Sequence, residues 1–340
     1  MTRHLAIVGP TASGKSSIAL AVAAARGDVE IVSLDSMQVY RGMDIGTAKP
    51  TPAERAAVRH HLVDVVDPSE EWSVRDTQSA ARAAVADIEA RGRRALLVGG
   101  TGLYVRAVID GLCVPPRDLG VRAGIEQEAA TADGLAHAYA RLAAADPLAA
   151  ARIEPGNTRR IVRALEVLET TGRPFSSFGA GLADYGPPAF DVGLVGIWLP
   201  RAELGRRIAA RFAAMRAGGL EAEVRALAGR RRDSSEGPPS EDSSRRRTGL
   251  SRTAAQAIGY KEILAHLDGE IATLDDAFDL AVRRTRQFAR RQRVWFRRDP
   301  RIRWVGTARN PHGLAAVVLA LWEPAVTTVP TVATVAADRS

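Results

Sequence analysis

A glycine-rich segment near the amino terminus has the residue types and spacing needed to hold phosphate. Gly9-Pro10-Thr11-Ala12-Ser13-Gly14-Lys15-Ser16 follows the pattern G-x-x-x-x-G-K-S. The apolar run Leu5–Val8 before it predicts a strand, and the alanine-rich run Ser16–Arg26 after it predicts a helix. Backbone N–H groups at the start of such a helix bind phosphate oxygens, Lys15 adds a positive charge, and the Ser16 hydroxyl can coordinate Mg²⁺. We therefore predict that this loop forms a phosphate site.

The rest of the chain argues against a nucleoside triphosphatase. Such enzymes usually carry a carboxylate at the end of a neighbouring strand to hold the metal ion. Here the apolar run 95–98 ends in Gly-Gly-Thr-Gly at 99–102, and the chain has no Asn-Lys-x-Asp guanine motif. The sequence therefore favours a ligand that carries a diphosphate without being a nucleotide.

Asp35 is the candidate general base. It follows the second predicted strand, Glu30–Leu34, at the edge where parallel sheets build their sites. A carboxylate there can take a proton from an attacking nucleophile. The alternative is that Asp35 caps the turn that follows it, and position alone leaves both roles open.

The composition is that of a basic globular protein. The 340 residues carry a formal net charge of +8 and a pI near 10.3, which favours a polyanionic partner, although a bias toward arginine explains part of the charge. No apolar run reaches the length of a membrane helix, and the first strand begins too early to leave room for a signal peptide. The lone Cys113 excludes an intrachain disulfide framework. We expect a cytoplasmic monomer without membrane contact, in which Cys113 is a small buried residue.

Strands that alternate with helices predict an α/β fold, with a P-loop NTPase-like parallel sheet core. We assign residues 1–112 and 189–322 to this core and its C-terminal helices, and 113–188 to a helical insertion domain. Residues 230–247 are predicted to be a mobile charged loop, and 323–340 a disordered tail. The C-terminal region should contain helices at Arg201–Ala228, Thr253–His266 and Leu274–Arg297.

The last of these helices is dense in arginine. Eight arginines lie between 283 and 298, and only Asp279 and Asp299 flank this run. This pattern favours a nucleic-acid surface over a solvated face. Trp295, which lies among the arginines, is expected to belong to the core.

Several motifs, in order, resemble those of one enzyme family. They are the phosphate loop, Asp35–Tyr40, Asp44–Pro50, Gly99–Tyr104, Asn157–Val167, Arg207–Met215 with Gly219 and Leu220, Ala257–Glu262 and Thr285–Phe296. Together they cover about 1–300, and the chain is similar to the tRNA dimethylallyltransferases (tRNA isopentenyltransferases). A single cysteine leaves no C-terminal zinc finger of the eukaryotic kind, so the resemblance is to the bacterial type.

The resemblance implies transfer of a dimethylallyl group from dimethylallyl diphosphate to the exocyclic N6 of the adenine just 3′ of the anticodon, with Mg²⁺. It places Thr11 near the reacting centre, Arg211 against the diphosphate and Asp35 as the base. All residues from Gly9 to Ser16 would contact the diphosphate, with Ser16 on the metal.

The resemblance also implies contacts with the anticodon stem-loop of tRNA, whose target base must be swung out to react. The residues lining the base end would be Asp35, Ser36, Met37, Gln38 and Thr101. Further contacts would come from Arg122, Arg159, Arg160, Ile161, Val162 and Arg163, from Gln256, Ala257, Ile258, Gly259, Tyr260 and Lys261, and from Arg290 and Arg291.

Two other functions remain open at this point. A relative in the same superfamily could prenylate free adenine nucleotides, but the helical insertion and the arginine-rich helix favour a macromolecular substrate. A small-molecule kinase or nucleotide-binding regulatory module would share the loop, but it would need the missing strand-end carboxylate or a base-reading motif.

Overall fold

A computed structural model describes residues 2–179, 182, 184–229, 249–306 and 312–322. The predicted mobile loop at 230–247 and the predicted tail at 323–340 lie outside the described residues.

A six-stranded sheet forms the centre of the fold, with all its strands parallel in the order β3-β2-β4-β1-β5-β6. The strands are β1 (His4–Val8), β2 (Val29–Ser33), β3 (His60–His61), β4 (Arg94–Gly99), β5 (Val192–Trp198) and β6 (Ile302–Gly306). The sequence did not indicate β3 or β6. β3 has only two residues, and β6 is an edge strand in which only Ile302 and Val305 are buried, so neither forms an apolar run.

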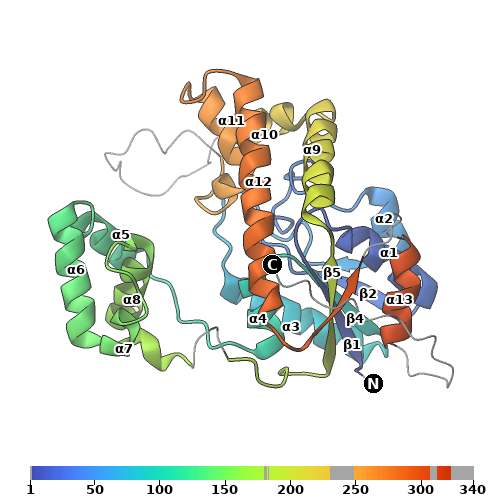
Figure 1. The fold of residues 1–340 in the computed structure, drawn as a ribbon, viewed down its shortest axis with the longest axis horizontal. Coiled ribbons are helices and arrows are strands. Elements are labelled where there is room, and N and C mark those ends of the chain that lie inside the picture. Colours follow the sequence, from blue (N-terminus) through green and yellow to red (C-terminus); the bar gives the residue numbers. More distant parts are fainter. Residues whose placement is uncertain (1, 180–181, 183, 230–248, 307–311, 323–340) are drawn as a thin grey trace.

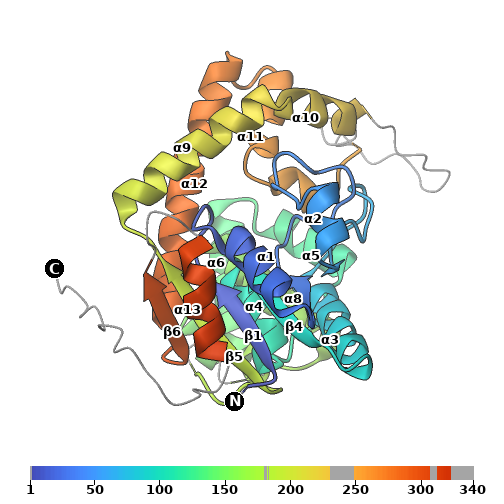
Figure 2. The same cartoon turned by 90° about the vertical axis from the view of Figure 1, so that its right-hand side faces the viewer.

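Helices cover both faces of this sheet, as a parallel sheet requires (Figures 1 and 2). On one face, α1 (Lys15–Arg26) and α13 (His312–Trp322) pack on the sheet around a core that includes Ile7, Ile18 and Trp322. On the other face lie α3 (Val74–Ala90), α4 (Gly102–Asp110) and the long α12 (Leu274–Arg297). The predicted α/β P-loop-like core is thus confirmed.

The helices beyond the carboxyl edge of the sheet correct two predictions. The expected helix Arg201–Ala228 is divided into α9 (Arg201–Ala217) and α10 (Leu220–Gly229), because Gly219 adopts a left-handed φ of 90°. The expected helix Thr253–His266 is also wrong at its start. A single 3₁₀ turn, Ala254–Gln256, precedes Gly259 with φ 99°, and α11 (Tyr260–Leu267) begins only after it. The short α2 (Pro52–Ala57) lies near the second strand.

The insertion between α4 and β5 stands beside the sheet as a group of helices (Figure 1). It contains α5 (Leu119–Glu128), α6 (Ala132–Ala145), α7 (Pro147–Ala150) and α8 (Thr158–Thr171), and these enclose a hydrophobic cluster separate from the two cores of the sheet. Cys113, in the segment leading to α5, is exposed, so the expectation of a buried cysteine was wrong.

The hydrophobic cluster of the insertion depends on Leu142, whose side chain is fully buried, whereas Leu148 on α7 is 66% exposed. Leu142→Ala should lower the free energy of unfolding by about 2–5 kcal/mol, because it leaves a cavity in the cluster. Leu148→Ala is the matched control and should change it by less than about 0.5 kcal/mol. Urea titration of both variants measures the difference; equal losses would show that the cluster is not tightly packed.

Candidate active site

The phosphate loop follows β1 directly, and its conformation depends on its glycines. Gly9 has φ 150°, and a Cβ there would lie 3.0 Å from the carbonyl oxygen of Ile197 on the adjacent strand. Gly14 has φ 92° and precedes the first turn of α1. These positions favour glycine, because a side chain at Gly9 would crowd β5 and both φ values lie in the region glycine tolerates. The loop thus wraps around the N-terminus of α1, where unpaired N–H groups can face an anion.

Two cations face this loop from different elements. The Nζ of Lys15 donates a hydrogen bond of 2.7 Å to the carbonyl oxygen of Pro10. The Nη1 of Arg211, which comes from α9, lies 3.4 Å from the hydroxyl oxygen of Thr11 and donates to it. The structure therefore brings Thr11, Lys15 and Arg211 together, although Arg211 is distant from the loop in sequence.

Burial perturbs both cations. Desolvation lowers the pKa of Lys15 to about 7, against the opposing charge of Asp35 and together with the like charge of Arg211. Desolvation also lowers the pKa of Arg211, again opposed by Asp35, but a guanidinium remains charged. The free site is thus electrostatically prepared for an anion, which would favour the protonated form of Lys15.

Asp35 follows the end of β2 and influences the charges of both Lys15 and Arg211. Its Oδ1 accepts hydrogen bonds from the backbone N–H of Met37 at 2.8 Å and of Gln38 at 3.4 Å. The turn-capping role is therefore present. Oδ2 accepts no hydrogen bond from the described residues, so this oxygen is available for proton transfer.

Sequence reasoning missed Gln292, which joins α12 to the phosphate loop. Its side chain is 5% exposed. Its Oε1 accepts from the backbone N–H of Thr11 at 2.9 Å, and its Nε2 donates to the carbonyl oxygen of Gly100 at 2.8 Å. The available signal was a lone amide on the otherwise mostly apolar buried face of α12. A buried amide with both ends paired fixes the spacing of the two segments it bridges.

The Gly-Gly-Thr-Gly segment after β4 makes room for α12. A Cβ on Gly100 would lie 2.8 Å from the Nε2 of Gln292, and one on Gly102 would lie 2.1 Å from the indole of Trp295. Trp295 is half-buried and packs against the main core, which agrees with the expected core position. The end of β4 therefore carries no carboxylate, and α12 packs against this region instead.

The residues expected at the base end lie beside Asp35. Ser36 and Met37 are half-buried, and the hydroxyl of Thr101 makes no capping hydrogen bond to α4. Gln38 already uses both ends of its amide, because Oε1 accepts from the Ser33 hydroxyl at 2.8 Å and Nε2 donates to the carbonyl oxygens of Thr47 and Ala48. Any contact of Gln38 with a base must replace or share these bonds.

A carboxylate from α10 holds the loop that supports Gln38. Glu223 accepts hydrogen bonds from the backbone N–H groups of Asp44, Ile45 and Gly46 at 2.9, 2.8 and 3.3 Å. It also accepts a hydrogen bond from the hydroxyl of Tyr260, whose pKa is raised by burial and by this carboxylate. Tyr260 is fully buried, so its side chain positions this loop and does not face solvent.

Within the insertion, several residues expected to contact RNA are used internally. Glu166 is fully buried and forms ion pairs with Arg122 at 3.4 Å and Arg163 at 3.0 Å. Ile161 and Val162 lie in the hydrophobic cluster and are buried, and their contact with RNA stays a prediction. Arg159 and Arg160 are exposed, as their expected role requires.

The segment 256–261 likewise contains both exposed and buried residues. The side chains of Gln256 and Lys261 are exposed and bonded to each other at 3.0 Å, whereas Ala257 and Gly259 are buried and Ile258 is partly buried. On α12, Arg290 and Arg291 are both exposed. Consecutive helical residues point about 100° apart, so these two arginines lie on different faces.

The described residues contain no group of three or more His, Cys, Asp or Glu side chains that could hold a metal ion. The exposed hydroxyl of Ser16 makes no hydrogen bond within the described part of the chain. One hydroxyl fits Mg²⁺ only if phosphate oxygens and water complete its shell, which is how Mg²⁺ is usually held in phosphate sites. Among the helices that the structure describes, none is long and apolar enough to cross a membrane.

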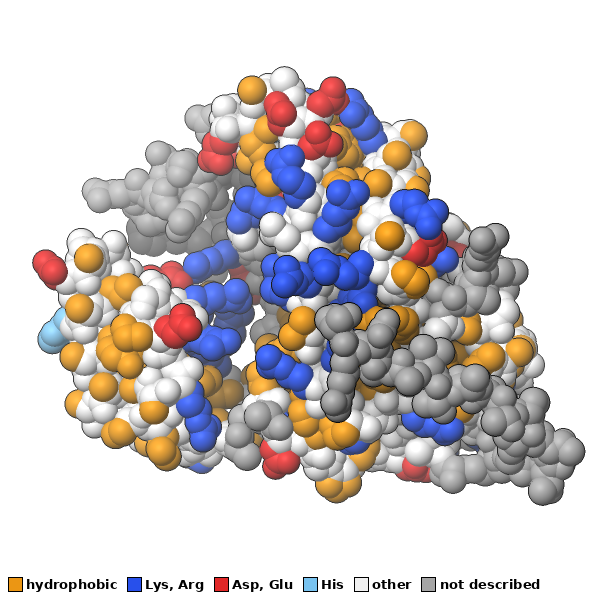
Figure 3. All heavy atoms as spheres, in the orientation of Figure 1, with side chains coloured by type: hydrophobic (Ala, Val, Ile, Leu, Met, Phe, Trp, Pro, Cys, Tyr) orange, Lys and Arg blue, Asp and Glu red, His pale blue; other side chains and the backbone are white. Residues whose placement is uncertain are grey.

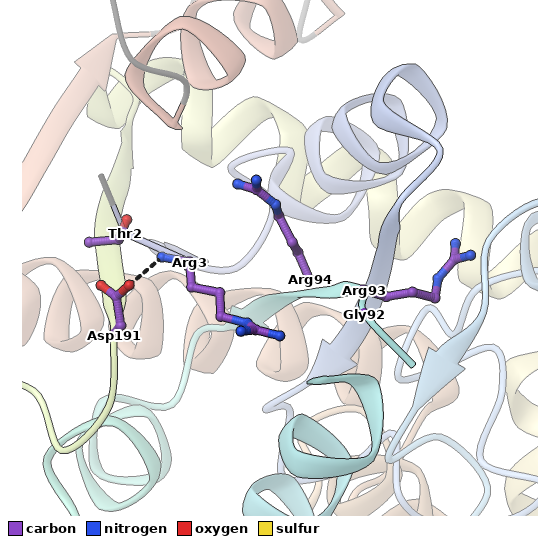
Figure 4. Close-up of a pocket in the computed structure, with 6 residues that line it drawn as sticks. All are labelled: Thr2, Arg3, Gly92, Arg93, Arg94 and Asp191. Carbon is purple, nitrogen blue, oxygen red and sulfur yellow. Dashed lines mark hydrogen bonds between the residues drawn. The ribbon is translucent and has the colours of Figure 1, made fainter. Parts of the chain in front are cut away.

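A hollow of about 340 Å³ lies at the opposite, amino-terminal edge of the sheet (Figure 4). It is lined by Thr2, Arg3, Gly92, Arg93, Arg94 and Asp191. The backbone N–H of Arg3 donates to Asp191 at 2.8 Å, and the side chains of Arg93 and Arg94 diverge (Figure 4). This hollow is therefore not part of the phosphate site.

Comparisons with known proteins agree with the geometry. The IPP transferase family pattern matches residues 38–299. The chain is 51% identical over 317 residues to a tRNA dimethylallyltransferase of Salinispora arenicola (93% of this chain, 85% of that protein). It is 49% identical over 328 residues to that of Kineococcus radiotolerans (93% and 95%).

Solved structures are similar as well. The tRNA isopentenylpyrophosphate transferase of Bacillus halodurans superimposes with a TM-score of 0.61 at 37% identity, over 94% of this chain and 97% of that one. A eukaryotic dimethylallyltransferase acting on tRNA gives a TM-score of 0.70 at 27% identity, over 89% and 73%.

The lowered pKa of Lys15 predicts proton uptake when a diphosphate binds. At pH 8.5 the Lys15 amine of the free protein is mostly neutral, because its pKa is about 7, and a bound polyanion raises that pKa. Calorimetry at pH 8.5 in buffers of different ionisation enthalpy should show uptake approaching about one proton per diphosphate. Lys15→Arg is the control and should bind without uptake, since arginine stays charged. Equal uptake by both proteins would contradict the assignment.

The two bonds of Gln292 predict a positioning role. Gln292→Glu keeps an acceptor for the Thr11 N–H but places a carboxylate against the Gly100 carbonyl oxygen, so turnover should fall roughly tenfold. Gln287→Glu, at an exposed position of the same helix, makes the same chemical change and should leave turnover unaltered. Steady-state kinetics compare the two; equal rates would exclude a positioning role for Gln292.

Proposed function

This chain belongs to the IPP transferase family, and we propose that it transfers a dimethylallyl group from dimethylallyl diphosphate to N6 of the adenine 3′-adjacent to the anticodon of tRNA. The observation that carries the proposal is the convergence of Thr11, Lys15, Arg211 and Asp35 at one edge of the sheet. Three groups there suit a departing diphosphate, and the fourth suits a nucleophile that must lose a proton.

In this proposal the loop and its two cations stabilise the leaving group. An allylic carbon–oxygen bond breaks readily when the negative charge that develops on the diphosphate is neutralised. Gly9, Pro10, Thr11, Ala12, Ser13 and Gly14 form the cradle, and Lys15 and Arg211 provide positive charge. Ser13 has a buried hydroxyl oxygen that lacks a hydrogen-bond partner, which a phosphate oxygen would supply. A divalent ion, with Mg²⁺ as our choice, would bind through the Ser16 hydroxyl and add charge neutralisation.

Asp35 acts on the nucleophile. An exocyclic amine is a weak nucleophile, and it gains reactivity when a carboxylate orients it and accepts its proton as the carbon–nitrogen bond forms. Hydrogen bonds from the backbone N–H groups of Met37 and Gln38 hold Oδ1 of Asp35, which leaves its Oδ2 to contact the amine. Thr101 and Ser36, beside Asp35, would contact the base.

The RNA would lie between the insertion and α12. Arg159 and Arg160 are exposed on α8, and Arg291 is exposed on α12. In Figure 3, lysine and arginine side chains gather along α12 and along the side of the insertion that faces it. Arg122 and Arg163 would support this surface through Glu166, because their guanidinium groups are held by that buried carboxylate.

Asp35→Asn tests the catalytic role of the carboxylate. Asparagine keeps an oxygen for the Met37 N–H but cannot take a proton, so the transfer rate should fall by about 10²–10⁴-fold. The dissociation constant for tRNA should change little. Single-turnover transfer and tRNA binding are measured in parallel. A loss of tRNA affinity as large as the loss of rate would mean that Asp35 serves binding or folding instead.

A further inference from the structure

The arginines of α12 form two separate faces. Arg283, Arg286, Arg290, Arg293 and Arg297 recur at intervals of three and four residues, which places them on one side of the helix. Arg284, Arg291 and Arg298 recur at seven-residue intervals on the other side, where Arg284 pairs with Glu262 of α11. The buried seam with Ala289, Gln292 and Phe296 lies between them.

The first face ends in an unusual cluster around Trp198. The guanidinium carbon of Arg293 lies 4.0 Å from the centroid of the Trp198 ring, and that of Arg297 lies 4.8 Å from it. Trp198 itself is held by an edge-to-face contact with Trp304 of β6 at 6.0 Å. The Trp198 indole, at the end of β5, thus contacts two guanidinium groups and holds both cations in position.

No carboxylate neutralises this cluster within the described part of the chain. Arg201, Arg293 and Arg297 form no ion pair with any described residue, and Nη1 of Arg293 is buried without a hydrogen-bond partner. Burial lowers the pKa of Arg293, and the like charges of Arg297 and Arg201 lower it further. Most other arginines that the structure buries or half-buries have an acidic or carbonyl partner, as Arg106 and Arg301 do. The Nη1 donor of Arg293, which lies among like charges, therefore lacks an anionic partner among the described residues.

We propose that Arg293 and Arg297, whose guanidinium groups lie over Trp198, bind a backbone phosphate of the RNA substrate, at a site separate from the phosphate loop. The same face of α12 continues through Arg290, Arg286 and Arg283, all exposed, for about 21 Å at 1.5 Å per residue. A row of this length fits a strand carrying successive phosphates better than one small anion. The site rests on the proposed function, because it assigns RNA as the polyanion.

A pair of double variants tests the site. Arg293→Gln/Arg297→Gln removes two cations from the cluster. Arg59→Gln/Arg225→Gln removes two exposed arginines that each have a carboxylate partner, and it makes the same change in net charge. The affinity for unmodified tRNA is measured from low to moderate salt with each full-length protein. Thermal unfolding is recorded for each, and Arg297→Gln alone, at an exposed position, serves if the double variant is unfolded.

The cluster variant should bind tRNA about tenfold more weakly, and its log–log salt slope should be smaller in magnitude by about 1, for the one phosphate that the cluster no longer binds. The control variant should keep the wild-type slope. Unchanged affinity and slope in a folded cluster variant would overturn the proposal. Inorganic diphosphate is titrated separately. We expect one diphosphate site in the wild type and one in the variant. If the wild type has a second diphosphate site that the variant lacks, while tRNA binding is intact in the variant, the cluster binds a free anion and the RNA site is refuted.

The proposed function is tested in the same samples. Transfer from dimethylallyl diphosphate to tRNA by the wild-type protein is followed alongside binding. If the wild type transfers to tRNA but the salt slopes are equal, only the phosphate site fails. If the wild type transfers nothing to tRNA, the proposed function fails, whatever the slopes are.

Discussion

The close contact between α12 and the carboxyl edge of the sheet is the constraint on which the site depends. Gln292 bonds to Thr11 and Gly100, and positions 100 and 102 must lack side chains for the helix to approach this closely. One helix therefore fixes the phosphate loop on its buried side and presents arginines on its exposed sides. The helix that carries the arginines and the phosphate loop are thus connected by a single buried amide.

The lowered pKa values in the site follow from the packing of helices around the phosphate loop. Packing of α9 and α12 around the loop removes water from Lys15 and Arg211, and the loss of water lowers the pKa of both. Two desolvated cations beside one carboxylate are tolerated because Asp35 compensates part of the cost. In the proposed reaction, an incoming diphosphate would complete the compensation, and the same groups would stabilise the charge that develops on it in the transition state.

Sequence alone predicted the parts that are local. The phosphate loop, the strands at 5–8, 30–34, 95–98 and 192–199, and the position of Asp35 follow from short patterns whose physics acts within a few residues. The α9–α10 break at Gly219 was missed because the helical pattern continues on both sides of it. The role of Arg211 required the resemblance, since nothing in its own segment distinguishes it from Arg206 or Arg207. Gln292, Glu166 and Glu223 escaped because each acts through partners far away in the chain.

The central claim is that one site joins an allylic diphosphate to an RNA base. Incubation of the wild-type protein with labelled dimethylallyl diphosphate, Mg²⁺, and either unmodified tRNA or AMP tests it most directly. We expect label to enter the tRNA, at the adenine 3′ of the anticodon, and not to enter AMP. Label in AMP but not in tRNA would contradict the account, and would show instead that the arginine faces and the helical insertion do not serve a macromolecular substrate.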